Sequence, residues 1–267
     1  MIYGKADRAL IEVSECRYGR MTYLGNDRYM GGALARYGEY SESEVDLWRG
    51  ILRPTALVAD VGANIGIHTV ALSGLVPEGF VVAIEPLTYL FYGLCANLFL
   101  NGITNVKAIN ACAGAAQGTL KVPALDYTAT GDVANYGGMN MEHHVQGNPV
   151  AVVRLDDICQ RLDFIKIDVE GMEWQVISGA KRIVEECQPI LYVENNPGPR
   201  QRLLVEQINT IGYDCWWHLA PHYNPENHRG MAPADEGEEK IVSWNMVCLP
   251  ANAANTEAMG CEPIVYG

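Results

Sequence analysis

Short apolar runs alternate with longer amphipathic stretches along the chain from residue 56 onward. The runs have the length and composition of buried strands, and the stretches between them repeat apolar residues at helical spacing. The predicted strands are 56–61, 80–85, 105–111, 164–169 and 189–195. The predicted helices are 67–76, 88–102, 173–186 and 200–212. Strands that alternate with helices in this way form βαβ units, so we predict an α/β fold with a doubly wound, mostly parallel sheet.

The last part of the chain has a different pattern. Residues 213–220 and 240–250 both have strand patterns, and the loop between them shows no helical periodicity. Two strands joined without a helix are usually antiparallel, so we expect the parallel sheet to end in an antiparallel strand.

Residues 1–55 are predicted to form a short N-terminal cap, and residues 56–267 the main domain. Within the cap, residues 41–52 begin with Ser and acidic residues and continue with apolar positions at helical spacing. Ser41 is the predicted N-cap of this helix, and Glu44 three residues later completes a capping box.

A long polar segment, residues 123–149, separates the third and fourth predicted strands. It is rich in glycine, and loops longer than about 12–15 residues inside compact domains are usually functional or disordered. We expect either a lid that faces the substrate or a plain surface loop. His143 and His144 lie within this segment.

Composition and charge narrow the classes of function. The chain has 267 residues, of which 49% are hydrophobic and 19% charged, so one large domain with a sizeable core is expected. Its formal net charge of −13 would repel phosphate backbones, which argues against a nucleic-acid partner. The sequence has no signal-peptide pattern and no apolar stretch of the roughly 20 residues that a membrane span needs.

The eight cysteines are spread along the chain without a CxxC pair or a zinc-like Cys/His spacing. Several lie inside apolar runs, where a free thiol behaves as a small hydrophobic side chain. We therefore expect reduced cysteines and a cytoplasmic protein. Peripheral membrane association and oligomer formation stay open.

The stretch VADVGANIG at residues 58–66 places an acid and small residues at the end of the first predicted strand. Ligands of open α/β sheets bind at the carboxyl ends of the strands, so this is either a ligand-binding loop or a tight turn with no ligand. The dinucleotide pattern GxGxxG fails because residue 64 is Asn, and Asp60 would repel a pyrophosphate. The positive charges of S-adenosylmethionine (SAM) would instead be attracted.

A second feature also fits SAM. Glu85 ends the second predicted strand, 23 residues after Gly62, where a carboxylate can hold both hydroxyls of a ribose. The amino-acid end of SAM would then lie at the glycine loop, with the adenine near residues 111–113 of the third strand.

Several longer segments resemble the FkbM family of SAM-dependent methyltransferases, over a region from about Tyr23 to Pro250. The segments are VADVGANIGIHTVAL, VVAIEP, LCANLFLNGITNV, RLDDI, IKIDVEGMEWQVISGA and PILYVENN. The resemblance implies the class I methyltransferase (Rossmann-like) sheet, whose last strand is antiparallel. It also implies O-methylation of a hydroxyl, often on a sugar or polyketide, and hence a small-molecule hydroxyl acceptor, glycosylated acceptors included.

The predicted cofactor-binding residues come from these strand ends and from the segment YGEYSESE at residues 37–44. That segment can fold over the cofactor or serve only as the lead-in to a helix, and His68 can touch the cofactor or cap the turn. The full set is Tyr37, Glu39, Asp60, Gly62, Ala63, Asn64, Gly66, His68, Thr69, Glu85, Pro86, Ala111, Cys112, Ala113 and Asp168.

A second group of polar residues follows the fourth and fifth predicted strands. Asp168 and Glu170 belong to IKIDVEG, and Glu194 and Asn195 lie at the equivalent point of YVENN. The two strand ends should be neighbours, about 4.8 Å apart. Methyl transfer to an alcohol requires alignment of the oxygen and removal of its proton, which these acids, or His218 near the last strands, can accept.

This group allows two further interpretations. Its oxygen atoms suit Mg²⁺ or another divalent cation, and catechol-type O-methyltransferases have a similar arrangement. Alternatively, the acids after the fourth strand cap the helix that follows. The predicted catalytic residues are Asp168, Glu170, Glu194 and His218. The predicted metal ligands are Asp168, Glu194 and Asn195.

The first functional prediction is therefore a SAM-dependent O-methyltransferase. One alternative is a nucleotide-dependent oxidoreductase, which the missing second glycine and Asp60 disfavour. The other is a non-catalytic SAM-binding module.

Overall fold

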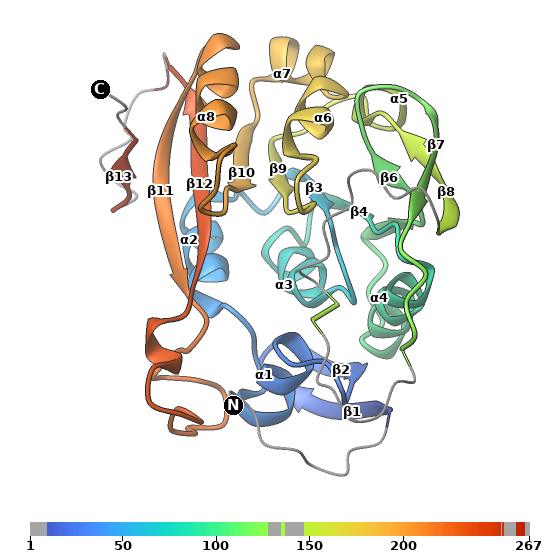
Figure 1. The fold of residues 1–267 in the computed structure, drawn as a ribbon, viewed down its shortest axis with the longest axis vertical. Helices are drawn as coiled ribbons and strands as arrows, with labels where there is room; N and C mark the ends of the chain where they lie inside the picture. The colour runs from blue at the N-terminus through green and yellow to red at the C-terminus, as the bar shows by residue number, and fades with distance from the viewer. Residues whose placement is uncertain (1–9, 128–134, 137–146, 252, 254–259, 265–267) are drawn as a thin grey trace.

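The computed structural model describes residues 10–127, 135–136, 147–251, 253 and 260–264. An eight-stranded mixed sheet crosses the molecule, with helices on both faces (Figure 1). From one edge to the other, its strands are β13 (Glu262–Pro263), β11 (Tyr213–Pro221), β12 (Val242–Pro250), β10 (Ile190–Glu194), β9 (Phe164–Ile167), β3 (Leu57–Val61), β4 (Phe80–Ile84) and β5 (Val106–Ile109).

Five neighbouring strands of this sheet, β10, β9, β3, β4 and β5, run parallel to one another. The long strand β12 is antiparallel to both of its neighbours, β10 and β11. The doubly wound parallel sheet with an antiparallel last strand, as predicted from the sequence, is therefore confirmed.

Two layers of helices cover the sheet. The helices are α1 (Met30–Tyr37), α2 (Glu42–Ile51), α3 (Ile67–Leu75), α4 (Thr88–Leu100), α5 (Leu155–Ile158), α6 (Glu173–Ser178), α7 (Lys181–Cys187), α8 (Gln201–Thr210) and the short 3₁₀ helix η1 (Glu238–Lys240). Val58 of β3 packs with Trp48 of α2 on one face of the sheet. Ala59, the next residue, points to the other face and packs in one core with Val176 of α6 and Leu204 of α8.

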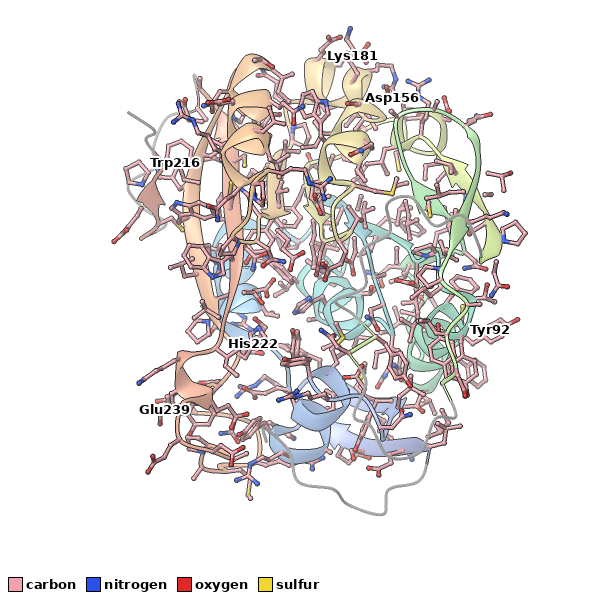
Figure 2. All side chains as sticks on the ribbon, in the orientation of Figure 1. Tyr92, Asp156, Lys181, Trp216, His222 and Glu239 are labelled. Atoms are coloured by element: carbon pink, nitrogen blue, oxygen red, sulfur yellow. The ribbon has the colours of Figure 1, made fainter. Side chains whose placement is uncertain are left out.

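The helix predicted at residues 173–186 consists of two helices, α6 and α7, which are separated at Gly179. A β-carbon on Gly179 would lie 2.1 Å from the carbonyl oxygen of Gly114, so this close approach requires glycine. Asp156 of α5 lies near Lys181, the first residue of α7 (Figure 2). Its carboxylate accepts hydrogen bonds from the amides of Arg182 and Ile183 at 2.9 and 3.1 Å and so caps α7. The apolar positions keep helical spacing across the break, so periodicity did not reveal it.

Two smaller sheets lie beside the main one. The N-terminal hairpin consists of β1 (Ile11–Cys16) and β2 (Gly19–Leu24). The other sheet consists of β6 (Cys112–Ala113), β8 (Asn148–Val153) and β7 (Gly118–Val122). Since β8 begins at Asn148, the predicted loop 123–149 is wrong at its end. Most of that segment, with His143 and His144, lies outside the described residues, so the lid stays a prediction.

Asn97 of α4 and Asn101, which directly follows this helix, attach the hairpin to the rest of the fold through the backbone of β2. Asn97 accepts a hydrogen bond from the amide of Thr22 at 2.7 Å and donates one to the carbonyl oxygen of the same residue at 3.0 Å. Asn101, one helical turn later, does the same for Arg20 at 2.9 and 2.7 Å. Asn97 also donates to the carbonyl oxygen of Ile65 at 2.7 Å. The hairpin and the loop before α3 thus share one buried amide.

The capping box predicted at the start of α2 is wrong. Ser41 does precede the helix, but its backbone is left-handed (φ 48°) and its side chain makes no capping hydrogen bond. Its hydroxyl instead donates to the carboxylate of Glu44 at 2.7 Å, and both side chains are buried.

In the part of the chain that the structure describes, no helix is both long and apolar enough to cross a membrane. No disulfide bond joins the described cysteines.

Candidate functional site

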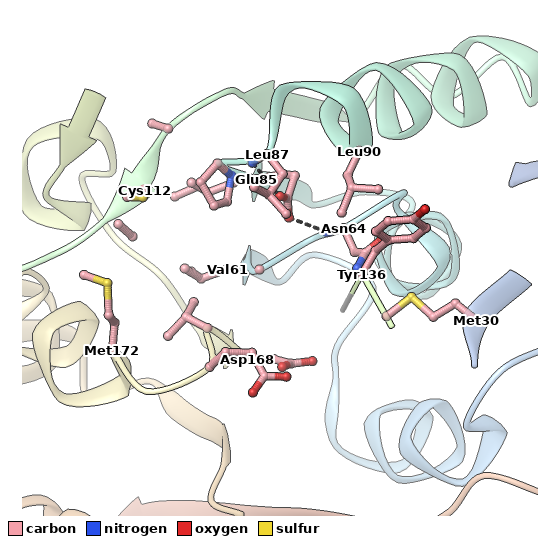
Figure 3. Close-up of a pocket in the computed structure, with 17 residues that line it drawn as sticks. Met30, Val61, Asn64, Glu85, Leu87, Leu90, Cys112, Tyr136, Asp168 and Met172 are labelled. Atoms are coloured by element: carbon pink, nitrogen blue, oxygen red, sulfur yellow. Dashed lines mark hydrogen bonds between the residues drawn. The ribbon is translucent and has the colours of Figure 1, made fainter. Parts of the chain in front are cut away.

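A cavity of about 590 Å³ opens at the carboxyl ends of β3, β4 and β9. Figure 3 shows Glu85 and Asp168 on opposite sides of it, with Cys112 and Met172 toward one end and Met30 and Tyr136 toward the other. The lining residues are Met30, Val61, Gly62, Asn64, Ile84, Glu85, Pro86, Leu87, Leu90, Ala111, Cys112, Ala113, Tyr136, Asp168, Val169, Glu170 and Met172. The end of each predicted strand from the first to the fourth therefore contributes to one site.

The glycine loop brings its backbone against the end of β9. Gly62 has φ 85°, and a β-carbon there would lie 1.7 Å from the carbonyl oxygen of Asp168. At Gly66, with φ 84°, a β-carbon would lie 2.5 Å from Cδ1 of Leu94 in α4. Both glycines are therefore required by contacts within the protein, and the cavity lies beside the loop that these contacts shape.

Glu85 is fixed by two backbone amides of neighbouring turns. One carboxylate oxygen accepts from the amide of Asn64 at 2.8 Å, and the other accepts from the amide of Leu87 at 2.7 Å (Figure 3). Burial raises the pKa of Glu85 to about 7. Each oxygen keeps a further lone pair, so the pair of oxygens can also accept hydrogen bonds from two neighbouring hydroxyls.

Asp60 does not line the cavity, although it was predicted to contact the cofactor. Its carboxylate is completely buried and accepts a hydrogen bond from the hydroxyl of Thr69 at 2.6 Å. Nζ of Lys166 lies 3.4 Å from Asp60 and 3.2 Å from Asp168. These carboxylates raise the pKa of Lys166 despite its burial, so the ammonium stays charged between them.

Three carboxyl groups meet where β9 and β10 end. One oxygen from each of Asp168, Glu170 and Glu194 lies within 4.8 Å of the others. Burial, followed by the charge of Asp168, raises the pKa of Glu170 to about 8. Burial and the charges of Asp168 and Glu170 also raise the pKa of Glu194. We call these three residues the carboxyl cluster.

Asn195, the third predicted metal ligand, is held by contacts within the protein. Its amide nitrogen donates to the carbonyl oxygen of Gln201 at 3.0 Å and contacts Sδ of Met246 at 3.2 Å. The amide nitrogen of Asn195 is thus used within the protein, and its role as a metal ligand stays a prediction.

Tyr37 and Glu39 also lie away from the cavity. Tyr37 donates a hydrogen bond from its hydroxyl to the carboxylate of Glu238 at 2.6 Å. Glu39 is paired with Arg17 at 2.6 Å and accepts from the backbone amide of His228 at 2.7 Å. Both residues tie the cap to the loop between β11 and β12.

The two candidate histidines lie outside the cavity, His68 buried and His218 partly buried. His68 packs edge-on against Trp48, with ring centroids 5.0 Å apart, and burial lowers its pKa. Nδ1 of His218 is hydrogen-bonded to the hydroxyl of Tyr192 at 2.7 Å, and burial lowers the pKa of His218 to about 4. The predicted catalytic role of His218 stays a prediction.

Of the fifteen predicted cofactor residues, the structure brings eight to the cavity: Gly62, Asn64, Glu85, Pro86, Ala111, Cys112, Ala113 and Asp168. The lining also includes residues that were not predicted. Met30 comes from α1, and Tyr136, to which Asn26 donates a hydrogen bond at 3.0 Å, lies in the chain between β7 and β8. No local sequence pattern marks Met30 as a cavity residue. For Tyr136, the only sequence signal is that tyrosines are frequent in this part of the chain.

Comparison with known proteins identifies the family. The family model of the methyltransferase FkbM domain matches residues 60–214, which is more than half of the chain. Methyltransferase sdnD of Sordaria araneosa is 27% identical, and the match covers 46% of this chain and 59% of that protein. The chain thus spans less than two thirds of the length of this relative.

A solved structure supports the fold independently. Methyltransferase FkbM of Methylobacillus flagellatus KT superposes with a TM-score of 0.50 at 22% identity, over 74% of this chain and 45% of that one. This likeness confirms the class I methyltransferase fold, and the family match favours methyl transfer over the dehydrogenase alternative. The chain belongs to the FkbM family of SAM-dependent methyltransferases.

Proposed function

We propose that this chain transfers a methyl group from SAM to a hydroxyl of a sugar, a polyketide or another small natural product. The observation that carries the proposal is the position of the carboxyl cluster. Asp168 and Glu170 line the cavity that Glu85 and the glycine loop also line, and Glu194 lies beside them. A methyl donor in the cavity would thus be next to groups that can accept a proton.

The residues of the cavity fit SAM. Glu85 offers two carboxylate oxygens to the ribose hydroxyls, and Leu87, Leu90 and Cys112 provide apolar surface for the flat adenine. When bound, SAM supplies a methyl group on a positively charged sulfur. The acidic end of the cavity, at Asp168 and Glu170, is electrostatically suited to that charge.

The chain's own part in the reaction is to orient the acceptor and to take its proton. The bond from the acceptor oxygen to the methyl carbon forms as the bond from that carbon to sulfur breaks. The hydroxyl proton goes to a carboxylate oxygen of the carboxyl cluster. His218 is the fourth residue predicted as a proton acceptor. Positioning can supply much of the barrier reduction, and a general base typically adds about 10²–10⁴-fold.

A divalent cation is a possible further component of the same site. Three carboxyl oxygens within 4.8 Å of one another suit Mg²⁺ or a similar hard cation. Asp168, Glu170 and Glu194 would hold it, and it would lower the pKa of a bound hydroxyl. If EDTA leaves the turnover of the wild-type protein unchanged, this component is excluded.

Isothermal titration calorimetry with SAM, S-adenosylhomocysteine and NAD tests the proposed donor. We expect heat from both sulfur compounds and none from NAD; binding of NAD alone would contradict the proposal. Catalysis is tested separately by S-adenosylhomocysteine production in the presence of hydroxylated acceptors. SAM binding without any product would instead support a non-catalytic SAM-binding module.

We also propose a cytoplasmic location. Eight cysteines without a disulfide among the described residues suit a reducing compartment. Cell fractionation with an antibody against the chain tests this.

A further inference from the structure

A second cavity, of about 1080 Å³, lies between the loops that follow β9 and β10. In Figure 1 these loops lead into α6 and α8 side by side. The lining residues are Glu170, Gly171, Glu173, Trp174, Gln175, Glu194, Asn195, Asn196, Pro197, Gly198, Pro199, Arg200, Gln201, Leu203, Leu204 and Gln207. All of them lie in the described part of the chain.

The two cavities meet at the carboxyl cluster. Glu170 lines both of them, Asp168 lines only the first, and Glu194 lines only the second. Oxygens of these three residues lie within 4.8 Å of one another. A group held in the second cavity therefore lies next to the carboxyl cluster, as does a group held in the first. A methyl donor and an acceptor can thus be brought together at the cluster.

Five of the sixteen lining residues carry amides, which both donate and accept hydrogen bonds: Gln175, Asn195, Asn196, Gln201 and Gln207. Gln175 and Gln207 present amides from α6 and α8, and Asn196 is hydrogen-bonded to the carboxyl of Glu194. Amides and protonated carboxyls match hydroxyl groups, which also donate and accept. Trp174 adds a flat aromatic surface on which the C–H face of a saturated ring can pack.

The charge of the lining disfavours anions. Glu170, Glu173 and Glu194 face the cavity, and Arg200 is the one basic residue among those that line it. Arg200 interacts electrostatically with Glu173, which offsets part of its charge. A phosphate or carboxylate on the acceptor would find no second basic side chain in this lining, since Glu173 already offsets part of the charge of Arg200.

The loop between β10 and α8 is built to hold its shape. Asn195 and Gln201 bond each other's backbone carbonyl oxygens at 3.0 and 3.2 Å, and Asn195 is 5% exposed. Pro197 and Pro199 restrict the backbone between them. The wall of the second cavity is therefore largely formed before a ligand arrives.

From these contacts we infer that the second cavity is the acceptor site and takes a neutral, polyhydroxylated ring. The ring hydroxyl that is methylated lies at the carboxyl cluster, and the other hydroxyls bond the amides of Gln175, Asn196 and Gln207. This inference rests on the proposed SAM-dependent O-methylation.

The first experiment measures transfer of tritiated methyl from SAM to defined acceptors. The panel contains methyl α-D-glucopyranoside, methyl α-L-rhamnopyranoside and myo-inositol as neutral polyols. Methyl α-D-glucuronide serves as the anionic match, with catechol and 1-octanol as acceptors of other classes. We expect label on at least one neutral polyol and at least about tenfold less on the glucuronide. Labelling of catechol or octanol in preference to every polyol overturns the inference.

Binding is measured in parallel, because the panel need not contain the best acceptor. Saturation-transfer difference NMR of the protein saturated with S-adenosylhomocysteine should detect the neutral polyols and not the glucuronide. If no polyol binds or is labelled by a protein that does bind SAM, the inference is wrong while the donor assignment stands. If SAM itself does not bind, the proposed function fails instead.

A matched pair of variants locates the polyol. Gln207→Leu removes one lining amide and should raise the KM or dissociation constant of the polyol about tenfold, with the dissociation constant of SAM unchanged. Gln160→Leu alters an exposed glutamine before β9, at the opposite end of that strand, and should change neither. Equal effects of the two variants would place the polyol elsewhere.

Discussion

The carbonyl oxygen of Asp168 lies 1.7 Å from the point that a β-carbon on Gly62 would occupy. The first residue of the glycine loop is thus fitted to the end of β9, where Asp168 enters the cavity. The glycine loop and the end of β9, which carries Asp168, are therefore in direct contact beside the cavity.

Gly62→Ala should destabilise the protein by at least about 2 kcal/mol, because both the contact with Asp168 and the φ of 85° exclude a side chain. Denaturant unfolding followed by circular dichroism measures the change. Gly74→Ala is the control: Gly74 lies in α3 with no atom within 4 Å of its would-be β-carbon. It should stabilise the protein by about 0.5–1 kcal/mol. Equal stability of the two variants would refute the packing argument.

Glu85→Gln should change how stability depends on pH. The folded-state pKa of Glu85 is about 7, above its ordinary value of 4.5, so folding favours the protonated form. The associated stability is fully present below pH 4.5 and is lost as pH rises through 7. The free energy of unfolding of the wild type, minus that of the variant, should therefore fall by roughly 3 kcal/mol across this interval.

The matched control for Glu85 is the exposed residue Glu78. Glu78 does not line the cavity, so Glu78→Gln should leave the dissociation constant of SAM unchanged. The Glu85→Gln variant should also bind SAM at least about tenfold more weakly, since one hydroxyl-binding oxygen is lost. If the difference in free energy of unfolding between the wild type and Glu85→Gln does not change with pH, burial does not raise the pKa of Glu85.

Lys166→Met should be among the most damaging single changes in the chain. It leaves the completely buried carboxylate of Asp60 without its cation, which typically costs about 3–5 kcal/mol. The double variant Asp60→Asn/Lys166→Met should lose less than the sum of its single variants. Arg161→Met breaks an exposed pair with Asp163 and should cost under about 1 kcal/mol. Additive losses at positions 60 and 166 would contradict the coupling.

Asn97→Ala should loosen the hairpin and the glycine loop together. Three buried hydrogen bonds are lost, to both backbone groups of Thr22 and to the carbonyl oxygen of Ile65, at a cost of about 2–4 kcal/mol. Amide hydrogen exchange measured by NMR should speed up at Thr22. Asn101→Ala, at the more exposed position, should speed up exchange at Arg20 and leave Thr22 protected.

The site residues that the sequence predicted are those whose position at the end of a strand is enough to bring them to the cavity. Gly62 and Glu85 follow short apolar strands, and the carboxyl ends of parallel strands meet at one edge of a sheet. This geometry needs only the order of strands and helices, so it is readable without tertiary contacts. Asp168 could be assigned to the site for the same reason.

The residues that sequence placed wrongly, or missed, depend on distant partners. Glu39 is held by the amide of His228, 189 positions away, and Tyr37 by Glu238, 201 positions away, so neither faces the cavity. Met30 reaches the cavity only because α1 is docked there. No local pattern encodes such contacts.

The carboxyl cluster contains an acid that the predicted metal set did not include. Glu170, whose own backbone is left-handed (φ 51°), lies with Asp168 and Glu194. A left-handed backbone at a residue other than glycine has no local sequence signal, so this position of Glu170 could not be predicted.

The contacts of Asn97 and Asn101 also cover one edge of the N-terminal hairpin. A two-stranded hairpin is marginally stable in water, and its outer edge can template a strand from another molecule. Asn97 and Asn101 fill that edge with side-chain amides, which take up both backbone groups of Thr22 and of Arg20. The two side-chain amides thus make the hydrogen bonds that a third strand would otherwise make with β2. Loss of both asparagines should therefore show itself as aggregation on concentration, even under conditions where the rest of the fold survives.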